Sequence, residues 1–355
     1  MTPELLTDLE TRQSASRSWF PPHLKMRPLL CDAVAQPQST DEVAVLVAWA
    51  EAQGKSLRAM GGGSGTGELA SVDIALDTSH LTELSWSEEN LTVTVGAGKT
   101  VGALEDQLAR HGYTTGHVLG SANLATVGGC IATDAHGLFT GRYGSFRESV
   151  LSQNTVGGII VEATLKMHPQ PEARAWAVFD FGDFDDACDA LRLIHRSDAR
   201  PSLARITSPP TPSPGRSSLA GKGETRIVLA FEGDEVVQTG HFQMAYAVCQ
   251  QLGGIPASPD DGERWLEGRQ RSDFWSANAQ SDTFADFMRQ KAPWSSVSET
   301  CQRLRNVLEG RVASLDIEVA HPTPHGATLE LAFTLHGDEQ RYRELRELIL
   351  PSRKA

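Results

Sequence analysis

The chain contains two glycine-rich stretches that narrow its architecture, Gly61-Gly62-Gly63-Ser64-Gly65-Thr66-Gly67 and Ala125-Thr126-Val127-Gly128-Gly129-Cys130-Ile131-Ala132-Thr133-Asp134-Ala135-His136-Gly137. Neither is a Rossmann fingerprint, because that motif needs a helix opening directly off its glycines. Neither is a Walker loop, since no Lys-Ser/Thr pair follows. The first stretch lies between two strand-like segments, 56–60 and 72–77. A glycine loop in that position still presents backbone N–H groups to an anion.

Length and composition are those of an ordinary globular protein. The 355 residues suffice for two domains, each with a sizeable core. Forty per cent of them are hydrophobic and 22% are charged. A net charge of −13 argues against nucleic acid or an anionic membrane as the main partner. An anionic substrate would therefore need a local basic pocket.

Cysteine usage and hydropathy indicate the class of protein. The five cysteines are odd in number, far apart and without a CxxC pattern, so neither a disulfide framework nor a metal site is expected. Residues 1–20 contain no apolar targeting core, and no run of 18 apolar residues occurs. We expect a cytoplasmic protein with no integral membrane segment.

The first part of the chain predicts a mixed α and β domain over residues 34–170, preceded by an N-terminal extension over 1–33. Ser39-Thr40-Asp41-Glu42 is a capping box that opens a helix ending at Gly54, with Glu42 reaching back to the helix start. Strand-like and helical segments then follow at 56–60, 72–77, 91–97, 101–112 (helix) and 158–168.

The pattern changes after residue 173 and predicts a second, α+β domain over 173–355. Alternating segments indicate an antiparallel sheet, and the apolar faces of the intervening helices predict that helices cover one side of it. The Pro-, Ser- and Gly-rich span 207–224 is expected to be a flexible surface loop. Strands are expected at 177–179, 227–231, 315–320 and 328–336, and helices at 184–194, 236–252 and 339–348.

Several short motifs, in order along the chain, resemble those of one flavoprotein family. They are Ala75-Leu76-Asp77-Thr78-Ser79, Gly112-Tyr113-Thr114-Thr115-Gly116-His117, Thr126-Val127-Gly128-Gly129, Asp261-Gly262-Glu263-Arg264 and Ala292-Pro293-Trp294. Residues 34–168 resemble the FAD-binding (PCMH-type) domain of the vanillyl-alcohol oxidase / p-cresol methylhydroxylase family, nearest the alkylglycerone-phosphate synthase branch. The Gly144-Ser145-Phe146 turn is more similar to alditol oxidases. The resemblance implies a two-subdomain FAD-binding domain followed by a cap domain.

The resemblance also implies FAD as cofactor and four segments that hold it. The first, at 59–65, would cradle the pyrophosphate, and the others would be 120–126, 133–136 and 154–160. The first loop contains no His, so the flavin is expected to bind non-covalently. The expected cofactor-binding residues are Ala59, Met60, Gly61, Gly62, Gly63, Ser64, Gly65, Gly120, Ser121, Ala122, Ala125, Thr126, Gly128, Gly129, Thr133, His136, Asn154, Thr155, Gly158 and Ile160.

Arg264 and His136 are candidates for the chemistry. Arg264 matches a family arginine near the substrate site, and its guanidinium suits bidentate binding of a phosphate or carboxylate. The alternative is a solvated helix arginine paired with a neighbouring glutamate. Arg271, seven residues on, would share the anion or be an exposed charge. His136 is either a donor near the flavin or substrate, or a loop histidine bonded to backbone.

Glu330 is the third candidate. Along the final strand, Glu330 and His336 share a face, which in the family lies over the flavin ring. With Glu318 they could provide a base that removes a hydroxyl proton, and Glu330 is taken as that base. The alternative is a polar face in contact with solvent.

The chain departs from the family pattern at two places. Ser152 runs almost directly into Asn154-Thr155-Val156-Gly157, where the family has a further strand, turn and helix, and this length difference exceeds ordinary loop variation. The sequence also ends at Ala355, where the family continues into a His-rich segment. We expect weak FAD affinity and slow turnover as a result.

The leading functional prediction is an FAD-dependent oxidoreductase acting on a small hydroxylated or phosphorylated substrate, a possible homodimer. Two alternatives stay open. One is an enzyme like alkylglycerone-phosphate synthase, and the other is a non-catalytic scaffold that keeps the flavoprotein fold.

Overall fold

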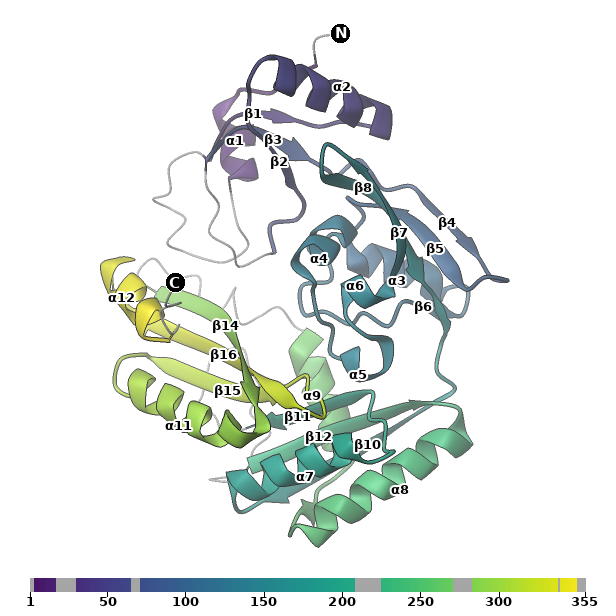
Figure 1. Ribbon diagram of the computed structural model, residues 1–355, viewed down its shortest axis with the longest axis vertical. Helices are drawn as coiled ribbons and strands as arrows, with labels where there is room; N and C mark the ends of the chain where they lie inside the picture. The colour runs from purple at the N-terminus through teal and green to yellow at the C-terminus, as the bar shows by residue number, and fades with distance from the viewer. Residues whose placement is uncertain are drawn as a thin grey trace. The chain divides into compact units, whose positions relative to one another are not determined.

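A computed structural model describes residues 3–16, 30–64, 71–207, 225–270, 283–337 and 339–349. The chain divides into two compact units (Figure 1). The first is built from the described residues up to Leu138 and from Tyr143 to Gln170. The second takes Phe139–Arg142 and the chain from Pro171 onward. No helix in the described ranges is long and apolar enough to cross a membrane.

The first unit opens with a parallel sheet in the order β1-β3-β2. These strands are β1 (Cys31–Ala35), β2 (Leu57–Met60) and β3 (Val72–Asp77). Helix α2 (Thr40–Ala52) buries Val43, Leu46 and Ala50, the apolar stripe that the sequence predicts, against this sheet. Gly61–Ser64, the described part of the first glycine stretch, follows β2.

Two described parts of the predicted N-terminal extension have regular structure. Helix α1 (Leu9–Ala15) precedes β1, and Leu6 and Val34 exchange backbone hydrogen bonds of 2.8 Å. Of the two hydrogen bonds predicted for the capping box at α2, one forms and the other has a different donor. The Ser39 hydroxyl accepts from the Glu42 N–H, but the Glu42 carboxylate accepts from the N–H of Gln38, one residue before the cap.

A four-stranded antiparallel sheet, in the order β4-β5-β8-β7, forms the rest of the first unit. Alternate residues of β8 are buried: Ile159 and Val161 pack with α2, and Ala163 and Leu165 pack with α3 and α4. The strands are β4 (Leu84–Ser87), β5 (Thr92–Gly96), β7 (Val150–Val156) and β8 (Ile159–Lys166). The shorter elements are α3 (Val101–Ala109), α5 (Thr140–Tyr143), α6 (Phe146–Ser149), β6 (Tyr113–Thr114) and β9 (His168–Pro169).

The second glycine stretch is not a continuous loop, which corrects the sequence interpretation. Helix α4 (Val127–Thr133) occupies its centre and contains Gly128 and Gly129. Glycine is a poor helix former, so the surrounding contacts must stabilise this turn of chain. Gly128 packs so closely on Ala97 that a Cβ atom on it would lie 2.8 Å from the Ala97 Cβ.

The second unit is a seven-stranded antiparallel sheet in the order β13-β10-β12-β11-β15-β16-β14. Its longest strand pair, β14 with β16, is in register over 11 residue pairs, from Thr283↔His336 to Pro293↔Gly326. The strands are β10 (Ala173–Phe181), β11 (Leu203–Thr207), β12 (Thr225–Gly233), β13 (Ile255–Pro256), β14 (Thr283–Pro293), β15 (Ser314–Ala320) and β16 (Gly326–His336).

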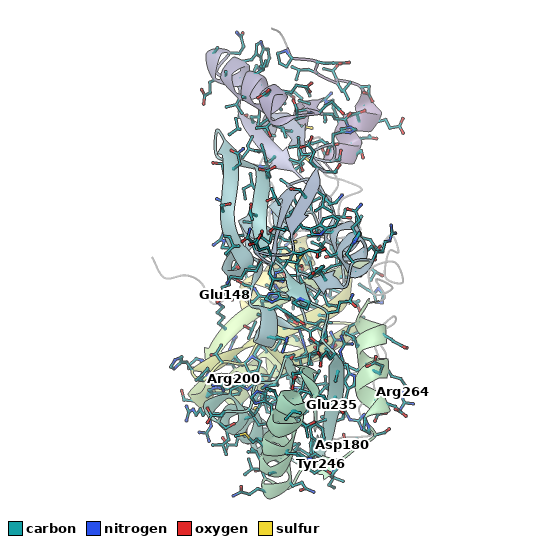
Figure 2. The ribbon with its side chains drawn as sticks, turned by 90° about the vertical axis from the view of Figure 1, so that its right-hand side faces the viewer. Glu148, Asp180, Arg200, Glu235, Tyr246 and Arg264 are labelled. Carbon is teal, nitrogen blue, oxygen red and sulfur yellow. The ribbon has the colours of Figure 1, made fainter. Side chains whose placement is uncertain are left out.

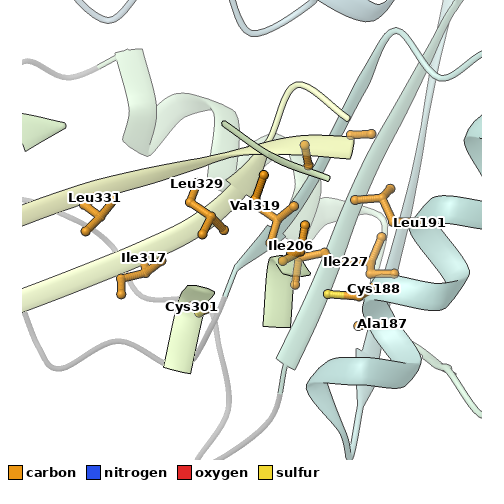
Figure 3. Packing of buried hydrophobic residues seen from close by; sticks show 14 of the residues in the cluster. Ala187, Cys188, Leu191, Ile206, Ile227, Cys301, Ile317, Val319, Leu329 and Leu331 are labelled. Carbon is orange, nitrogen blue, oxygen red and sulfur yellow. The ribbon is translucent and has the colours of Figure 1, made fainter. Parts of the chain in front are cut away.

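Four helices contribute to one hydrophobic cluster on one face of this sheet. The sequence predicts this one-sided cover and three of the four helices, but not the helix over Val297–Leu308. Leu191, Cys301, Ile227 and Leu329 are among the cluster's members (Figure 3). These helices are α7 (Phe184–Arg196), α8 (Glu235–Gln251), α11 (Val297–Leu308) and α12 (Glu339–Ile349), and a short 3₁₀ turn, Trp294–Ser296, precedes α11. Helix α9 (Asp260–Gln270), which carries Arg264, packs on the polar face, where Gly262 lies against the Trp176 ring.

Candidate functional site

The two glycine stretches meet in the first unit. A Cβ atom on Gly61 would overlap the Thr126 hydroxyl, and a Cβ atom on Gly62 would overlap the carbonyl oxygen of Leu124. Only glycine allows backbones to approach this closely. The structure thus brings together the first and second segments expected to hold the cofactor, Ala59–Ser64 and Gly120–Thr126. Gly65 lies outside the described residues.

The first segment presents backbone donors. Across the described ranges, no acceptor takes up the N–H groups of Gly61, Gly62 or Ser64. Gly61 and Gly62 are exposed, and Gly63 has a φ of +68°, the left-handed conformation that turns successive N–H groups toward one concavity. Before them, the carbonyl of Met60 accepts hydrogen bonds of 3.0 Å from both the N–H and the hydroxyl of Thr78, which fixes where the loop begins.

Hydrogen bonds to helix α3 hold the second segment in place. Val101 donates to the Ala125 carbonyl at 2.9 Å, and Gly102 donates to the Ala122 carbonyl at 2.8 Å. Thr126 then caps α4, accepting from the Gly129 N–H at 3.4 Å. Gly120, Ser121, Ala122 and Ala125 therefore lie on a turn fixed at its centre and its end.

The third segment follows α4 directly. The Thr133 hydroxyl donates to the Gly129 carbonyl at 2.8 Å, and Asp134 ends the helix with a φ of +50°. Nδ1 of His136 lies 2.7 Å from the Asp134 carbonyl oxygen, and because a carbonyl only accepts, Nδ1 is the protonated nitrogen. This backbone-bonded geometry is the alternative that the sequence left open for His136.

The fourth segment lies in the β7–β8 hairpin. Asn154 and Thr155 are exposed on β7, and the turn is Gly157-Gly158, both with positive φ. A Cβ atom on Gly157 would lie 2.5 Å from a Val47 methyl group of α2, so the turn packs on that helix. Ile160 instead packs against the hydrophobic cluster that includes Val127 and Ile131 of α4. After Ser152 the chain therefore continues directly into an antiparallel hairpin, whose register shifts between Val150 and Ser152 and between Asn154 and Thr155.

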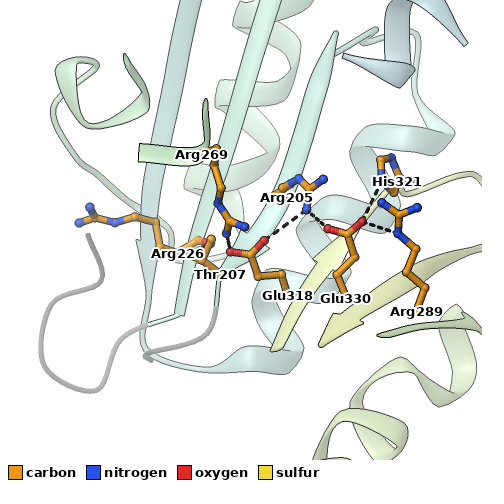
Figure 4. A network of polar contacts seen from close by, with 8 residues as sticks. All are labelled: Arg205, Thr207, Arg226, Arg269, Arg289, Glu318, His321 and Glu330. Carbon is orange, nitrogen blue, oxygen red and sulfur yellow. Dashed lines mark hydrogen bonds and ion pairs between the residues drawn. The ribbon is translucent and has the colours of Figure 1, made fainter. Parts of the chain in front are cut away.

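A buried ionic network lies on the polar face of the second unit's sheet (Figure 4). Arg205 contacts Glu318 at 3.2 Å and also pairs closely with Glu330. Glu330 accepts further from Nε of Arg289 at 3.0 Å and from Nε2 of His321 at 3.2 Å. Arg269 of α9 pairs with Glu318.

The network fixes the protonation of its members. Glu330 is buried, which alone would raise its pKa, but Arg205, His321 and Arg289 together hold the pKa well below its usual range. A carboxylate that is ionised and bonded to three donors is a weak proton acceptor, so these contacts favour an anchoring role for Glu330 over that of a base. Burial lowers the pKa of His321 to about 4.

Arg264 lies elsewhere. It pairs with Asp261 three residues before it on α9, and its side chain is 59% exposed at the surface (Figure 2). His336 lies at the end of β16, where Nδ1 is 3.1 Å from the Thr283 hydroxyl. The structure thus separates Arg264 from the Glu330 network, and Arg271 lies outside the described residues.

Sequence reasoning missed Arg205, Arg269, Arg289 and His321. The information that identifies them is the strand register, which the sequence alone does not give. Glu318, Glu330 and Arg289 become neighbours only when β15, β16 and β14 pair as they do. The five cysteines are free and buried, and no group of three or more metal-ligand side chains is placed to hold a metal ion in the part of the chain that the structure describes.

Comparison with known proteins gives a family for the first unit. Residues 31–165 match the model of the FAD binding domain. The chain is 23% identical to alkyldihydroxyacetonephosphate synthase of Dictyostelium discoideum over 78% of this chain and 54% of that protein. It is 26% identical to D-lactate dehydrogenase of Archaeoglobus fulgidus over 62% of this chain and 58% of that protein. The chain thus spans about half the length of these relatives.

Solved structures share the fold. An alkyldihydroxyacetonephosphate synthase structure superposes with a TM-score of 0.78 at 20% identity, covering 90% of this chain and 70% of that one. Substrate-bound p-cresol methylhydroxylase superposes with a TM-score of 0.73 at 14% identity, covering 97% and 83%. The predicted family resemblance and the α+β PCMH-type fold are confirmed, and FAD is confirmed as the cofactor of this domain family.

Proposed function

Residues 31–165 are an FAD binding domain, and from that premise we propose that the chain binds FAD non-covalently and oxidises a small hydroxylated or phosphorylated substrate. The observation that carries the proposal is the close packing of Gly61 and Gly62 on Leu124–Thr126, with the N–H groups of Gly61, Gly62 and Ser64 left to bind a ligand. The pyrophosphate of FAD is an anion that suits such a cradle.

The residues of the first unit fit this cofactor. Gly61, Gly62 and Ser64 would donate backbone hydrogen bonds to the pyrophosphate, and Gly120–Thr126 would line the opposite side. Thr133 and His136 would lie toward the flavin end, where Nε2 of His136, the nitrogen not bonded to Asp134, would accept a hydrogen bond. The exposed Asn154 and Thr155 and the turn at Gly158 would contact the other end of the cofactor. Bound FAD supplies a two-electron acceptor.

The substrate class follows from the names of the relatives and from charge. The relatives' names refer to a hydroxy acid, lactate, and to an alkyl derivative of dihydroxyacetone phosphate. Both compounds are small and anionic. A chain of net charge −13 needs a local cationic group to bind such a molecule, and we propose Arg264 as one contact. Glu330 would position arginines and would not itself accept the proton.

An ether-lipid synthase reaction is the second candidate. It is favoured by the match to alkyldihydroxyacetonephosphate synthase over 78% of this chain. A non-catalytic scaffold is the third. Redox turnover distinguishes the first candidate from the second, and flavin binding distinguishes both from the third.

The test uses the full chain, purified and incubated with FAD. The proposal expects saturable flavin binding, release of intact FAD on denaturation, and bleaching of the bound flavin by a small hydroxy acid or hydroxylated phosphate without oxygen. Bound flavin that no hydroxylated compound reduces would contradict the oxidoreductase proposal. A folded chain that takes up no FAD would favour the third candidate, the non-catalytic scaffold.

A further inference from the structure

One end of the ionic network on the polar sheet face carries an excess of positive charge. Glu318 pairs in register with Glu330, which pairs in register with Arg289. Arg205 and Arg269 complete the set, and His321 is neutral near pH 7 because burial lowers its pKa to about 4. Among these five side chains, three arginines thus face two glutamates, an excess of one positive charge within the set.

That excess charge is exposed at Arg289. The side chain of Arg205 is 4% exposed and that of Arg269 is 14% exposed, whereas that of Arg289 is 43% exposed. Arg289 donates to Glu330 through Nε alone. Its guanidinium carbon lies 5.1 Å from the centre of the Phe287 ring. Among the described residues no acceptor engages its terminal nitrogens. The two terminal nitrogens are therefore left to donate to a ligand, while the buried Glu330 carboxylate holds Nε.

A second cation lies beside Arg289. Lys291 follows two residues later on β14 and shares its face of the strand, where Thr328 is its partner on β16. Lys291 is exposed, and no carboxylate in the described ranges pairs with it. Lysine is common on edge strands, where it prevents pairing with other chains, and that could explain Lys291 by itself. The neighbouring Arg289, however, is held in position by the buried Glu330.

The loop after β15 brings His321 to the same place. His321 has a φ of +45°, a left-handed conformation that costs free energy for a residue other than glycine. Its Nε2 reaches the same Glu330 oxygen as Nε of Arg289. The strained turn therefore helps to fix the carboxylate that orients Arg289 (Figure 4).

We propose that Arg289 and Lys291 form an oxyanion site that binds the carboxylate or phosphate group of the substrate, with Glu330 and His321 as positioning residues. The inference rests on the proposed function for the identity of its ligand as substrate. The site itself requires only an oxyanion. A bidentate arginine with a lysine beside it matches the geometry and the charge of such a group.

Calorimetric titration of the full chain with inorganic phosphate, and separately with oxalate, tests the site. Both titrations are run at low, constant ionic strength, with and without FAD, because exposed cations are screened by salt. We expect saturable binding of at least one anion to the wild-type chain. Arg289→Gln and Lys291→Gln should each weaken it about tenfold, as expected for loss of a charge-assisted hydrogen bond.

Matched variants separate binding from folding. Arg200→Gln removes an arginine that is 62% exposed, lies 3.7 Å from Asp198 and donates to the Ser197 carbonyl, and it should leave the affinity unchanged. Lys291→Gln touches no carboxylate, so its effect is not one of folding. Absence of saturable binding to the wild type, or wild-type affinity in both site variants, would overturn the proposal. Anion binding in a chain that takes up no FAD would support the site while defeating the proposed function.

Discussion

The carbonyl oxygen of Leu124 occupies the space that a Cβ atom on Gly62 would need. Two residues that are more than 60 positions apart in the sequence, one in the first glycine stretch and one just before the second, therefore pack backbone against backbone. Sequence reasoning explains Gly62 by the approach of a ligand. The structure adds a reason that holds without any ligand, because the protein's own backbone already occupies the space beside this glycine.

Gly62→Val should abolish FAD binding. The added side chain must displace the Leu124 carbonyl and with it the turn that faces the exposed N–H groups. The measurement is the flavin content of the purified chain after incubation with FAD and removal of excess. Gly240→Ala is the matched control, since Gly240 is on helix α8 with nothing within 4 Å of an added Cβ. Unchanged flavin content in Gly62→Val would rule out the assignment of this loop.

Arg205→Met should destabilise the second unit by about 3–5 kcal/mol, because it leaves Glu318 and Glu330 side by side and buried without the cation between them. Urea unfolding followed by tryptophan fluorescence measures the change. Arg264→Gln, which breaks a pair whose arginine is 59% exposed, should cost less than about 1 kcal/mol. Equal stability of the two variants would show that the network contributes little.

The first unit should lose stability in mild acid through His117. Its ring is buried and stacked on Phe146 at 3.9 Å, with Nε2 3.1 Å from the Ser149 hydroxyl. Burial, with a smaller effect of His168 and His136, lowers the pKa of His117 from 6.5 to about 4. Between these values the unfolded chain binds a proton that the folded chain does not, so stability falls as the pH falls through this window and the loss is complete below about pH 4.

The expected loss from this histidine is about 2 kcal/mol between about pH 7 and about pH 5. Urea unfolding of the wild type and of His117→Gln at both pH values measures it. His117→Gln should flatten the pH dependence, whereas His80→Gln, which changes an exposed histidine, should not. The same slope in wild type and His117→Gln would contradict this role for His117. His321 adds a loss of the same sign in the second unit.

Prediction from sequence succeeds where a local residue pattern corresponds to one face of a single strand or helix. The alternation at 328–336 predicts β16, and its apolar residues Leu329, Leu331, Phe333 and Leu335 all join the helix-covered core. The motif order likewise predicts which segments meet at the glycine loop. Both results need only local periodicity or a shared motif.

It fails where tertiary contacts override the local pattern. Strand β14 escapes detection because Asp286 occupies a core-facing position. This position is tolerated because Tyr342 of α12 donates to the carboxylate at 2.6 Å and Arg346 lies 3.6 Å from it. Helix α4 contains two glycines and is fixed by bonds from Val127 to Lys99 and from Gly128 to Ala97. The Glu330 network depends on the register of three strands.

Flavin binding by the full wild-type chain tests the central claim most directly. Fluorescence titration with FAD should show saturable binding, acid denaturation should release all of the flavin, and Gly62→Val should bind none while Gly240→Ala binds as the wild type does. A folded wild-type chain that binds no FAD, or flavin that stays attached after denaturation, would contradict the account of a non-covalent cofactor held by the Gly61–Ser64 loop.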